Sequence, residues 1–210
     1  MNVLQFENIE DRHLGRALAL QAAQQPDATY IMFGATHYSF ADANRKVNEL
    51  AAGLADLGLG RGDRVAFYMN SAPEVIFLAL ASNKLGAVWT PINSDYKRAW
   101  LSETINRSRP KVVVTDTEHS ARLAEVRDDL ETGSIVVFGD STALPDATDF
   151  ETLYRTGAPE PDLSGQTYGD TCAILWTSGT TGRSKGVMQS HNVWFNAVAS
   201  GDALFGTKPG

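Results

Sequence analysis

RVAFYM at residues 64–69 begins a series of short apolar runs that alternate with segments of helical periodicity. The later runs lie at residues 87–90, 111–115 and 135–138, and the helical segments at 73–85, 98–107 and 118–130. Strands and helices that alternate at this spacing pack as parallel strands joined by right-handed helical crossovers. The sequence therefore predicts an α/β fold, in which helices cover both faces of a layered parallel sheet.

The segment before this series predicts two helices with a hairpin between them. Apolar residues recur every three or four positions in residues 13–25 and again in residues 43–57, where Gly58 is placed to end the helix. Two β-type runs, residues 30–33 and 37–40, flank Gly34 and favour a hairpin.

The last third of the chain begins with a polar connection. Residues 141–170 are rich in Asp and Pro, with a short helical pattern at 150–154. We interpret them as the boundary between a first α/β subdomain, residues 1–140, and the start of a second, residues 171–210. The second subdomain should contain a buried strand ending in CAILW (172–176), a strand at 185–189 and a helix at 192–205.

WTSGTTGRSKG, residues 176–186, has the composition of a phosphate-binding loop. Its glycines let the backbone approach a ligand and offer N–H groups to anionic oxygens, while Lys185 supplies a cation. A surface turn is the alternative for such a Ser, Thr and Gly cluster. The G-x-x-x-x-G-K-[ST] and G-x-G-x-x-G patterns are both absent, so neither common nucleotide-binding fold is supported.

Composition restricts the classes of partner. The chain is 43% hydrophobic and 20% charged, as in soluble globular proteins, and its net charge of -7 argues against a nucleic-acid surface. Cys172 is the single cysteine and lies in an apolar run, so we predict that it is a core residue. A chain that cannot form an internal disulfide indicates a reducing compartment. With no apolar run of about eighteen residues and no export signal, we expect a cytoplasmic protein without a membrane span.

Other polar and aromatic candidates are scattered. His191 precedes the last helix, where it either caps or packs, or contacts a substrate. The remaining histidines match no metal-ligand spacing, so no metal site is predicted. The four tryptophans are interpreted as core residues: Trp89, Trp100, Trp176 and Trp194.

The loop resembles the signature of the adenylate-forming (AMP-binding) superfamily, which includes acyl-CoA synthetases, luciferases and amino-acid adenylation domains. That signature reads Thr-Ser-Gly-Ser/Thr-Thr-Gly, then a variable residue, usually Pro, then Lys-Gly. Residues 177–182, Lys185 and Gly186 match, and Ser184 stands where Pro is usual. Because Pro would fix one backbone angle, this departure should loosen the loop slightly.

Three further segments resemble the family in the family's order, so the likeness covers nearly the whole chain. They are LGLGRGDRVA (57–66), NSAPE (70–74) and KLGAVWTPIN (84–93), and the last favours the acyl-CoA synthetase branch. The fold implied is the first part of the large N-terminal domain of these enzymes.

The resemblance implies ATP-dependent activation of a carboxylic acid to an acyl-adenylate and transfer of the acyl group to coenzyme A. ATP and Mg²⁺ are the implied cofactors, with CoA as acyl acceptor and a small carboxylic acid as partner. The resemblance assigns the ATP phosphates to Thr177, Ser178, Gly179, Thr180, Thr181, Gly182 and Lys185. No catalytic residue is assigned, because the family's catalytic lysine belongs to a carboxy-terminal domain that these 210 residues do not include.

The same comparison leads us to expect an amino-terminal part of a longer enzyme, inactive alone and prone to self-association through its last helix. The apolar side chains concerned are Val193, Phe195, Val198 and Leu204. A non-catalytic binding or assembly module is the alternative from another class. An amino-acid adenylation domain and a luciferase-like enzyme stay open within the superfamily, as do the acid and the choice between CoA and a carrier-protein thiol.

Overall fold

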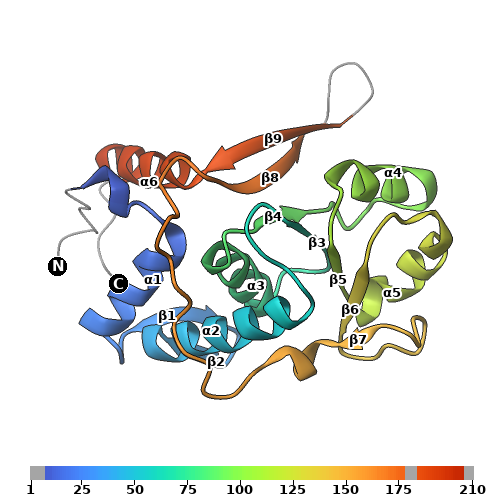
Figure 1. The fold of residues 1–210 in the computed structure, drawn as a ribbon, viewed down its shortest axis with the longest axis horizontal. Coiled ribbons are helices and arrows are strands. Elements are labelled where there is room, and N and C mark those ends of the chain that lie inside the picture. The colour runs from blue at the N-terminus through green and yellow to red at the C-terminus, as the bar shows by residue number, and fades with distance from the viewer. Residues whose placement is uncertain (1–7, 178–183, 206–210) are drawn as a thin grey trace.

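The computed structural model describes residues 8–177 and 184–205, with no side-chain placement for 202–205. Its main element is a seven-stranded sheet in the order β7-β6-β5-β3-β4-β8-β9, parallel at every pairing except β8–β9 (Figure 1). The strands are β3 Arg64–Tyr68, β4 Val88–Pro91, β5 Val112–Asp116, β6 Ser134–Phe138, β7 Thr148–Asp149, β8 Thr171–Thr177 and β9 Lys185–Ser190. This confirms the predicted α/β class.

Side chains of the central strands alternate between two separate cores. In β3, Val65 and Phe67 pack in one core, whereas Ala66 and Tyr68 pack in the other. The strands β3, β5 and β6 are therefore buried on both faces, which is why these segments are continuous apolar runs in the sequence. The two cores confirm that helices cover both faces of the sheet.

The helices divide between these two faces (Figure 1). Residues of α1 Leu14–Gln24, α2 Phe40–Asp56 and α3 Pro73–Lys84 fill the first core. Residues of α4 Arg98–Ser108 and α5 Thr117–Ala124 fill the second. The α6 helix, His191–Phe205, follows β9 directly, and three short 3-10 helices complete the described elements: η1 Ile9–Asp11, η2 Arg127–Asp129 and η3 Phe150–Leu153. In the described part of the chain, no helix is long and apolar enough to cross a bilayer.

The predicted hairpin forms, with one boundary corrected. The strands β1 Thr29–Phe33 and β2 Thr36–Ser39 pair antiparallel around Gly34, whose φ of 60° suits glycine. Phe40 was predicted to end the second strand but instead begins α2. Ser39 explains this start, because its side chain accepts a hydrogen bond from the N–H of Asp42 and so caps the helix.

Two further predictions need correction. The helix expected at 118–130 ends at Ala124, and the rest of that segment contains only the short η2 turn. Trp100 was expected in the core, but 55% of its surface is exposed on α4. The sequence pattern of 118–130 does not show where the helix ends. Val126 and Leu130 are buried although they lie outside α5, so buried apolar residues continue past the end of the helix.

The polar connection is held against α2 and α3 by a buried cation. The Lys84 side chain is fully buried, donates to Asn44 and Asn48 at 2.7 Å each, and pairs with Glu160 of the connection. Burial lowers the pKa of Lys84, against the opposing effect of Glu160. These contacts fix the path of the chain from β7 back to β8.

The strands expected for a second subdomain extend the first sheet, since β8 lies beside β4. The connection itself contributes β7 at the opposite edge of the sheet, a strand that the sequence did not predict. A division into subdomains at 141–170 stays a prediction.

Candidate functional site

The described ends of the predicted phosphate loop lie at the end of the β8–β9 strand pair. Because β8 runs parallel to β4, its carboxyl end lies at the same edge of the sheet as the carboxyl ends of β3, β4 and β5. In open α/β sheets, ligands bind outside this edge. Thr177 and Lys185 form the last cross-strand pair of the hairpin, so the two ends of the predicted loop meet here.

Two of the seven predicted phosphate contacts belong to this last pair. The Thr177 hydroxyl donates to the carbonyl of Lys185 at 3.4 Å, and both residues are exposed. In the part of the chain that the structure describes, no carboxylate lies within ion-pair distance of the Lys185 ammonium. The remaining predicted contacts lie outside the described residues: Ser178, Gly179, Thr180, Thr181 and Gly182.

Ser184, which precedes Lys185, is buried and held by two side chains. Its Oγ lies 3.1 Å from the Tyr96 hydroxyl, and its carbonyl accepts a hydrogen bond of 2.8 Å from Nη1 of Arg107. We expected the replacement of the usual Pro by Ser184 to loosen the loop. That expectation took no account of these contacts, which restrain the backbone at this position.

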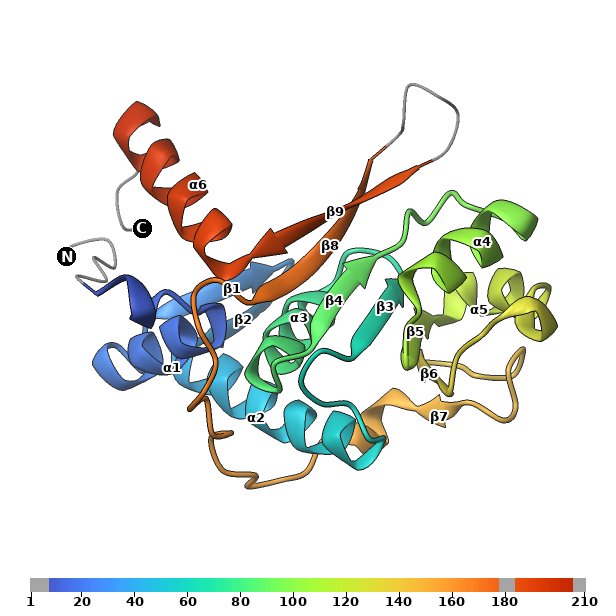
Figure 2. The same cartoon turned by 45° about the horizontal axis from the view of Figure 1, so that its top comes forward.

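The strand that enters the loop is also anchored near its end. The Trp176 indole N–H donates to the Thr90 hydroxyl of β4 at 3.0 Å, and the Arg107 guanidinium lies over the Trp176 ring at 5.0 Å. Figure 2 shows α4, which carries Arg107, beside this end of the hairpin and α6 at the other end. Trp176 packs at the margin of the second core, so both entry and exit of the loop rest on rigid elements.

A carboxylate and a histidine lie at the carboxyl end of β5. Asp116 accepts hydrogen bonds from the backbone N–H of Asn70 at 2.8 Å and from Nδ1 of His119 at 2.6 Å. Burial acts to raise the pKa of Asp116, but these hydrogen bonds hold it below its usual value. The pair stabilises the turn from β5 into α5, where Asp116 is the helix cap.

His191 lies at the opposite end of β9 from Lys185. The two positions are six residues apart along an extended strand, about 20 Å at roughly 3.3 Å per residue. The His191 ring is buried 3.9 Å from the His13 ring, and its Nδ1 accepts a hydrogen bond from the N–H of Leu14 at 3.3 Å. Burial lowers the pKa of His191 to about 3, so the ring is neutral. These contacts are those of a packing residue, and contact with a substrate stays a prediction.

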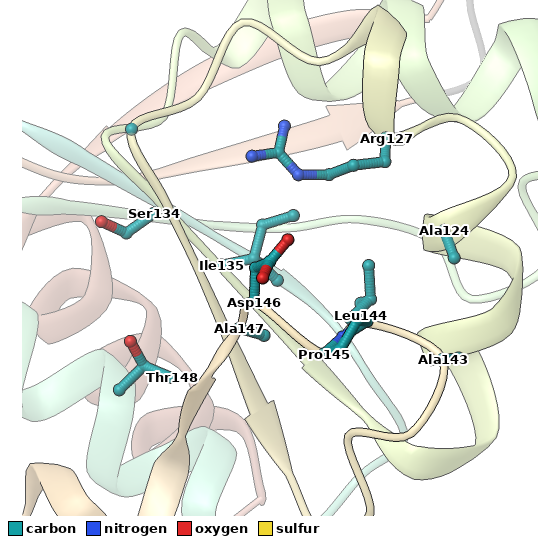
Figure 3. Close-up of a pocket in the computed structure, with 11 residues that line it drawn as sticks. Ala124, Arg127, Ser134, Ile135, Ala143, Leu144, Pro145, Asp146, Ala147 and Thr148 are labelled. Carbon is teal, nitrogen blue, oxygen red and sulfur yellow. The ribbon is translucent and has the colours of Figure 1, made fainter.

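Among the described residues, no metal cluster lies at the predicted loop. No group of three His, Cys, Asp or Glu side chains in residues 8–177 and 184–201 could hold a metal ion. A cavity of about 360 Å³ lies at the β6–β7 edge, where Figure 3 shows Arg127 and Asp146 with the apolar side chains of Ile135 and Leu144. This edge is at the far side of the sheet from β8–β9, so the cavity is no part of the predicted site.

Tyr96 and Arg107 are the site residues that the sequence did not indicate. They lie 88 and 77 positions before Ser184, and no local pattern links residues at such separations. Cys172, in contrast, was predicted as core and is fully buried, with its pKa raised to about 12 by burial. A buried strand is visible in one segment of sequence, whereas a contact between residues far apart in the sequence is not.

Comparison with protein families and curated proteins gives one consistent match. The family model described as AMP-binding enzyme matches residues 18–209. The crotonobetaine/carnitine–CoA ligase of Salmonella arizonae is 31% identical over 159 residues, covering 74% of this chain and 31% of the ligase. The medium/long-chain-fatty-acid–CoA ligase FadD6 of Mycobacterium tuberculosis is 28% identical over 186 residues, covering 89% of this chain. The chain thus spans about a third of the length of these relatives, 31% and 30% respectively.

Solved structures show the same relationship. A Rhodopseudomonas palustris protein described as a long-chain-fatty-acid CoA ligase superposes with a TM-score of 0.80 at 26% identity, over 91% of this chain and 48% of that one. The inhibitor-bound N-terminal domain of FACL13 from Mycobacterium tuberculosis gives a TM-score of 0.72 at 27% identity, over 85% and 44% of the two chains. The fold is therefore that of part of the N-terminal domain of adenylate-forming enzymes.

Proposed function

Because this chain belongs to the AMP-binding enzyme family, we propose that it provides the ATP phosphate-binding part of an acyl-CoA synthetase. The observation that carries the proposal is the Thr177–Lys185 pair, which brings both ends of the signature loop together at the carboxyl edge of the sheet. The exposed Lys185 ammonium, with no carboxylate partner among the described residues, suits contact with a polyphosphate.

In the proposed reaction a carboxylate oxygen of the acid attacks the α-phosphorus of ATP. The new P–O bond gives an acyl-adenylate, and the bond to the β-phosphate oxygen breaks to release pyrophosphate. A thiol, proposed to be that of CoA, then attacks the acyl carbon, loses its proton, and displaces AMP. The curated relatives are named as CoA ligases, which favours CoA over a carrier-protein thiol.

The contribution of this chain is to hold and neutralise the phosphates. We propose that backbone N–H groups and hydroxyls of Thr177, Ser178, Gly179, Thr180, Thr181 and Gly182 bind phosphate oxygens, and that Lys185 balances their charge. Such positioned donors act in the transition state without having to reorganise. Lys185 binds phosphate in this proposal and transfers no proton.

Mg²⁺ bound together with ATP would help to neutralise the charge of the phosphates. The described residues offer no cluster of carboxylates for it, so we derive no step through the metal. The 210-residue sequence also has no aromatic-x-Thr-Glu motif of the kind that serves adenine and magnesium in the family. We therefore propose that the 210-residue chain tested alone does not turn over.

Pyrophosphate release by the protein expressed from the whole reading frame that contains these residues tests the proposal. We expect release only when ATP, Mg²⁺ and a suitable carboxylic acid are all present, and formation of an acyl-CoA when CoA is added. A panel should span short, medium and long aliphatic acids, aromatic acids and amino acids. Release with amino acids alone would favour an adenylation domain, and a folded protein that is inactive with every acid would contradict the proposal.

A further inference from the structure

The usual family signature has Pro at the position of Ser184, and in this chain two side chains hold that position instead. The Tyr96 hydroxyl lies 3.1 Å from Ser184 Oγ, and Arg107 donates to the Ser184 carbonyl at 2.8 Å. Tyr96 and Ser184 are both buried, so water does not compete freely for their hydrogen bond. We call Tyr96, Arg107 and Ser184 the Ser184 clamp.

Both partners of Ser184 are themselves fixed by neighbouring elements. The Tyr96 carbonyl accepts a 2.7 Å hydrogen bond from the hydroxyl of Tyr68, and its ring stacks on Trp100 at 4.5 Å. Trp100 therefore has a packing role although more than half of it is exposed. The phenol that reaches Ser184 is thus tied to β3 through Tyr68 and to α4 through Trp100.

Arg107 has a comparable support. It lies in the last turn of α4, and its guanidinium stacks over Trp176, the residue before Thr177. The Arg107 guanidinium therefore contacts β8, the strand before the loop, and donates to Ser184, the residue directly before β9. Trp176 is fixed in turn by its hydrogen bond to Thr90.

From these contacts we propose that Tyr96 and Arg107 are positioning residues that set the backbone at Ser184 and thereby aim Lys185, which follows it, at the ATP phosphates. This inference rests on the proposed function for the role of Lys185. A proline ring restricts φ covalently, whereas serine leaves it free. The clamp supplies a restraint on the same residue through side chains that lie far away in the sequence.

The hydroxyl contact and the carbonyl contact make different predictions. A proline at position 184 has no hydroxyl for Tyr96 but keeps the carbonyl that Arg107 contacts. Substitution of Tyr96 should therefore change the KM for MgATP only when residue 184 is serine. Substitution of Arg107 should change it whether residue 184 is serine or proline. A residue that stabilised the fold without contacting residue 184 would not show this dependence.

The test is a double-mutant cycle of Tyr96→Phe and Ser184→Pro in the protein from the whole reading frame, with an acid that it activates. Tyr96→Phe alone should raise the KM for MgATP about fivefold, the value of one hydrogen bond, and leave the KM for the acid unchanged. In the Ser184→Pro background, Tyr96→Phe should not change the KM for MgATP further. Arg107→Ala should raise the KM for MgATP about tenfold in either background, and Arg107→Lys should recover part of this loss.

Amide hydrogen exchange of residues 185–187 in the 210-residue chain gives a readout that needs no turnover. Tyr96→Phe should speed exchange there but not in the β3–β5 core, and Tyr30→Phe, in the remote β1–β2 hairpin, serves as the matched control. The clamp would be overturned if Tyr96→Phe changed exchange equally with and without Ser184→Pro, or if it changed exchange in neither background. If the unsubstituted protein used no MgATP, the proposed function would fall, and exchange would still decide whether the clamp restrains the strand.

Discussion

At the residue scale, the structure separates side chains that the sequence could only group by type. Lys185 and Lys84 are both lysines of family segments, yet Lys185 is exposed at the loop and Lys84 is fully buried against Glu160. The first has a charge available to a ligand, and the second has its charge satisfied within the protein. Burial and partners, which are set by the whole fold, decide between a binding role and a structural one.

The buried pair of His13 and His191 makes the free energy of unfolding depend on pH. Burial lowers the pKa of both rings, to about 3 for His191, while an unfolded chain has histidines near pKa 6.5. The unfolded state therefore binds more protons, so the stabilising contribution is fully present above about pH 6.5 and is lost as pH falls towards the folded values. Arg16, which lies near both rings, lowers the pKa further.

Urea unfolding between pH 7 and pH 5 tests this pH dependence. We expect the free energy of unfolding to fall by up to about 1.4 kcal/mol per pH unit for each imidazole. The His191→Gln variant keeps an acceptor for the N–H of Leu14 but does not titrate in this range, so its curve should be flatter. Identical slopes for the two proteins would show that His191 is not buried in its neutral form.

At the element scale, the polar connection is a packed part of the fold and no free linker. Arg155 donates its backbone N–H to the Glu49 carbonyl at 3.1 Å, and η3 lies so close to α2 that only glycine fits at position 53. A Cβ at Gly53 would lie 1.9 Å from the carbonyl oxygen of Leu153. The sequence alone, with its Asp and Pro residues, had suggested a boundary with a short helix at 150–154 but not this packing.

Gly53→Ala should therefore destabilise the protein, because backbone must move to accept one methyl group. We expect the free energy of unfolding to fall by about 2 kcal/mol or more, and the melting temperature by about 5 °C or more. Gly201→Ala in α6 is the matched control, since a Cβ there meets nothing within 4 Å and alanine favours the helix. Equal melting temperatures for the two variants would mean that η3 does not pack on α2 in solution.

The elements predicted correctly are those whose signal is local. The strands β3, β5 and β6 are buried on both faces, so each is a continuous apolar run that can be recognised alone. The β7 strand has only two residues and the break after Ala124 depends on packing, so neither has such a signal. The phosphate loop is predicted from its own residues and stays a prediction, whereas the contacts of Tyr96 and Arg107 with Ser184 arise only when the chain folds.

At the scale of the whole molecule, one edge of the sheet carries exposed apolar side chains. On β9, Val187 is 41% and Met188 70% exposed, and on α6, Val193 is 45% and Val198 59% exposed. Two of the side chains predicted to be uncovered, Val193 and Val198, are therefore confirmed as exposed. Phe195 is half-buried, and the side chain of Leu204 lies outside the described residues.

We predict that the 210-residue chain self-associates through this edge. Edge strands with exposed apolar side chains pair readily with other chains, and charged residues there oppose pairing. Sedimentation velocity over a range of concentrations should show association, and Met188→Lys should reduce it, whereas Met32→Lys in the β1–β2 hairpin should not. A monomer at all concentrations would contradict the prediction.

We propose that the β8–β9 hairpin presents Lys185 to the phosphates of ATP. The rate at which an amine-reactive reagent labels Lys185, with and without MgATP, tests this in the protein from the whole reading frame. Lys111 is the internal control. It pairs with Asp63 and lies just before β5, at the amino ends of the parallel strands, whereas Lys185 lies at their carboxyl ends. We predict that MgATP slows labelling of Lys185 and leaves Lys111 unchanged, and unaltered labelling of Lys185 in a protein that activates its acid would contradict the claim.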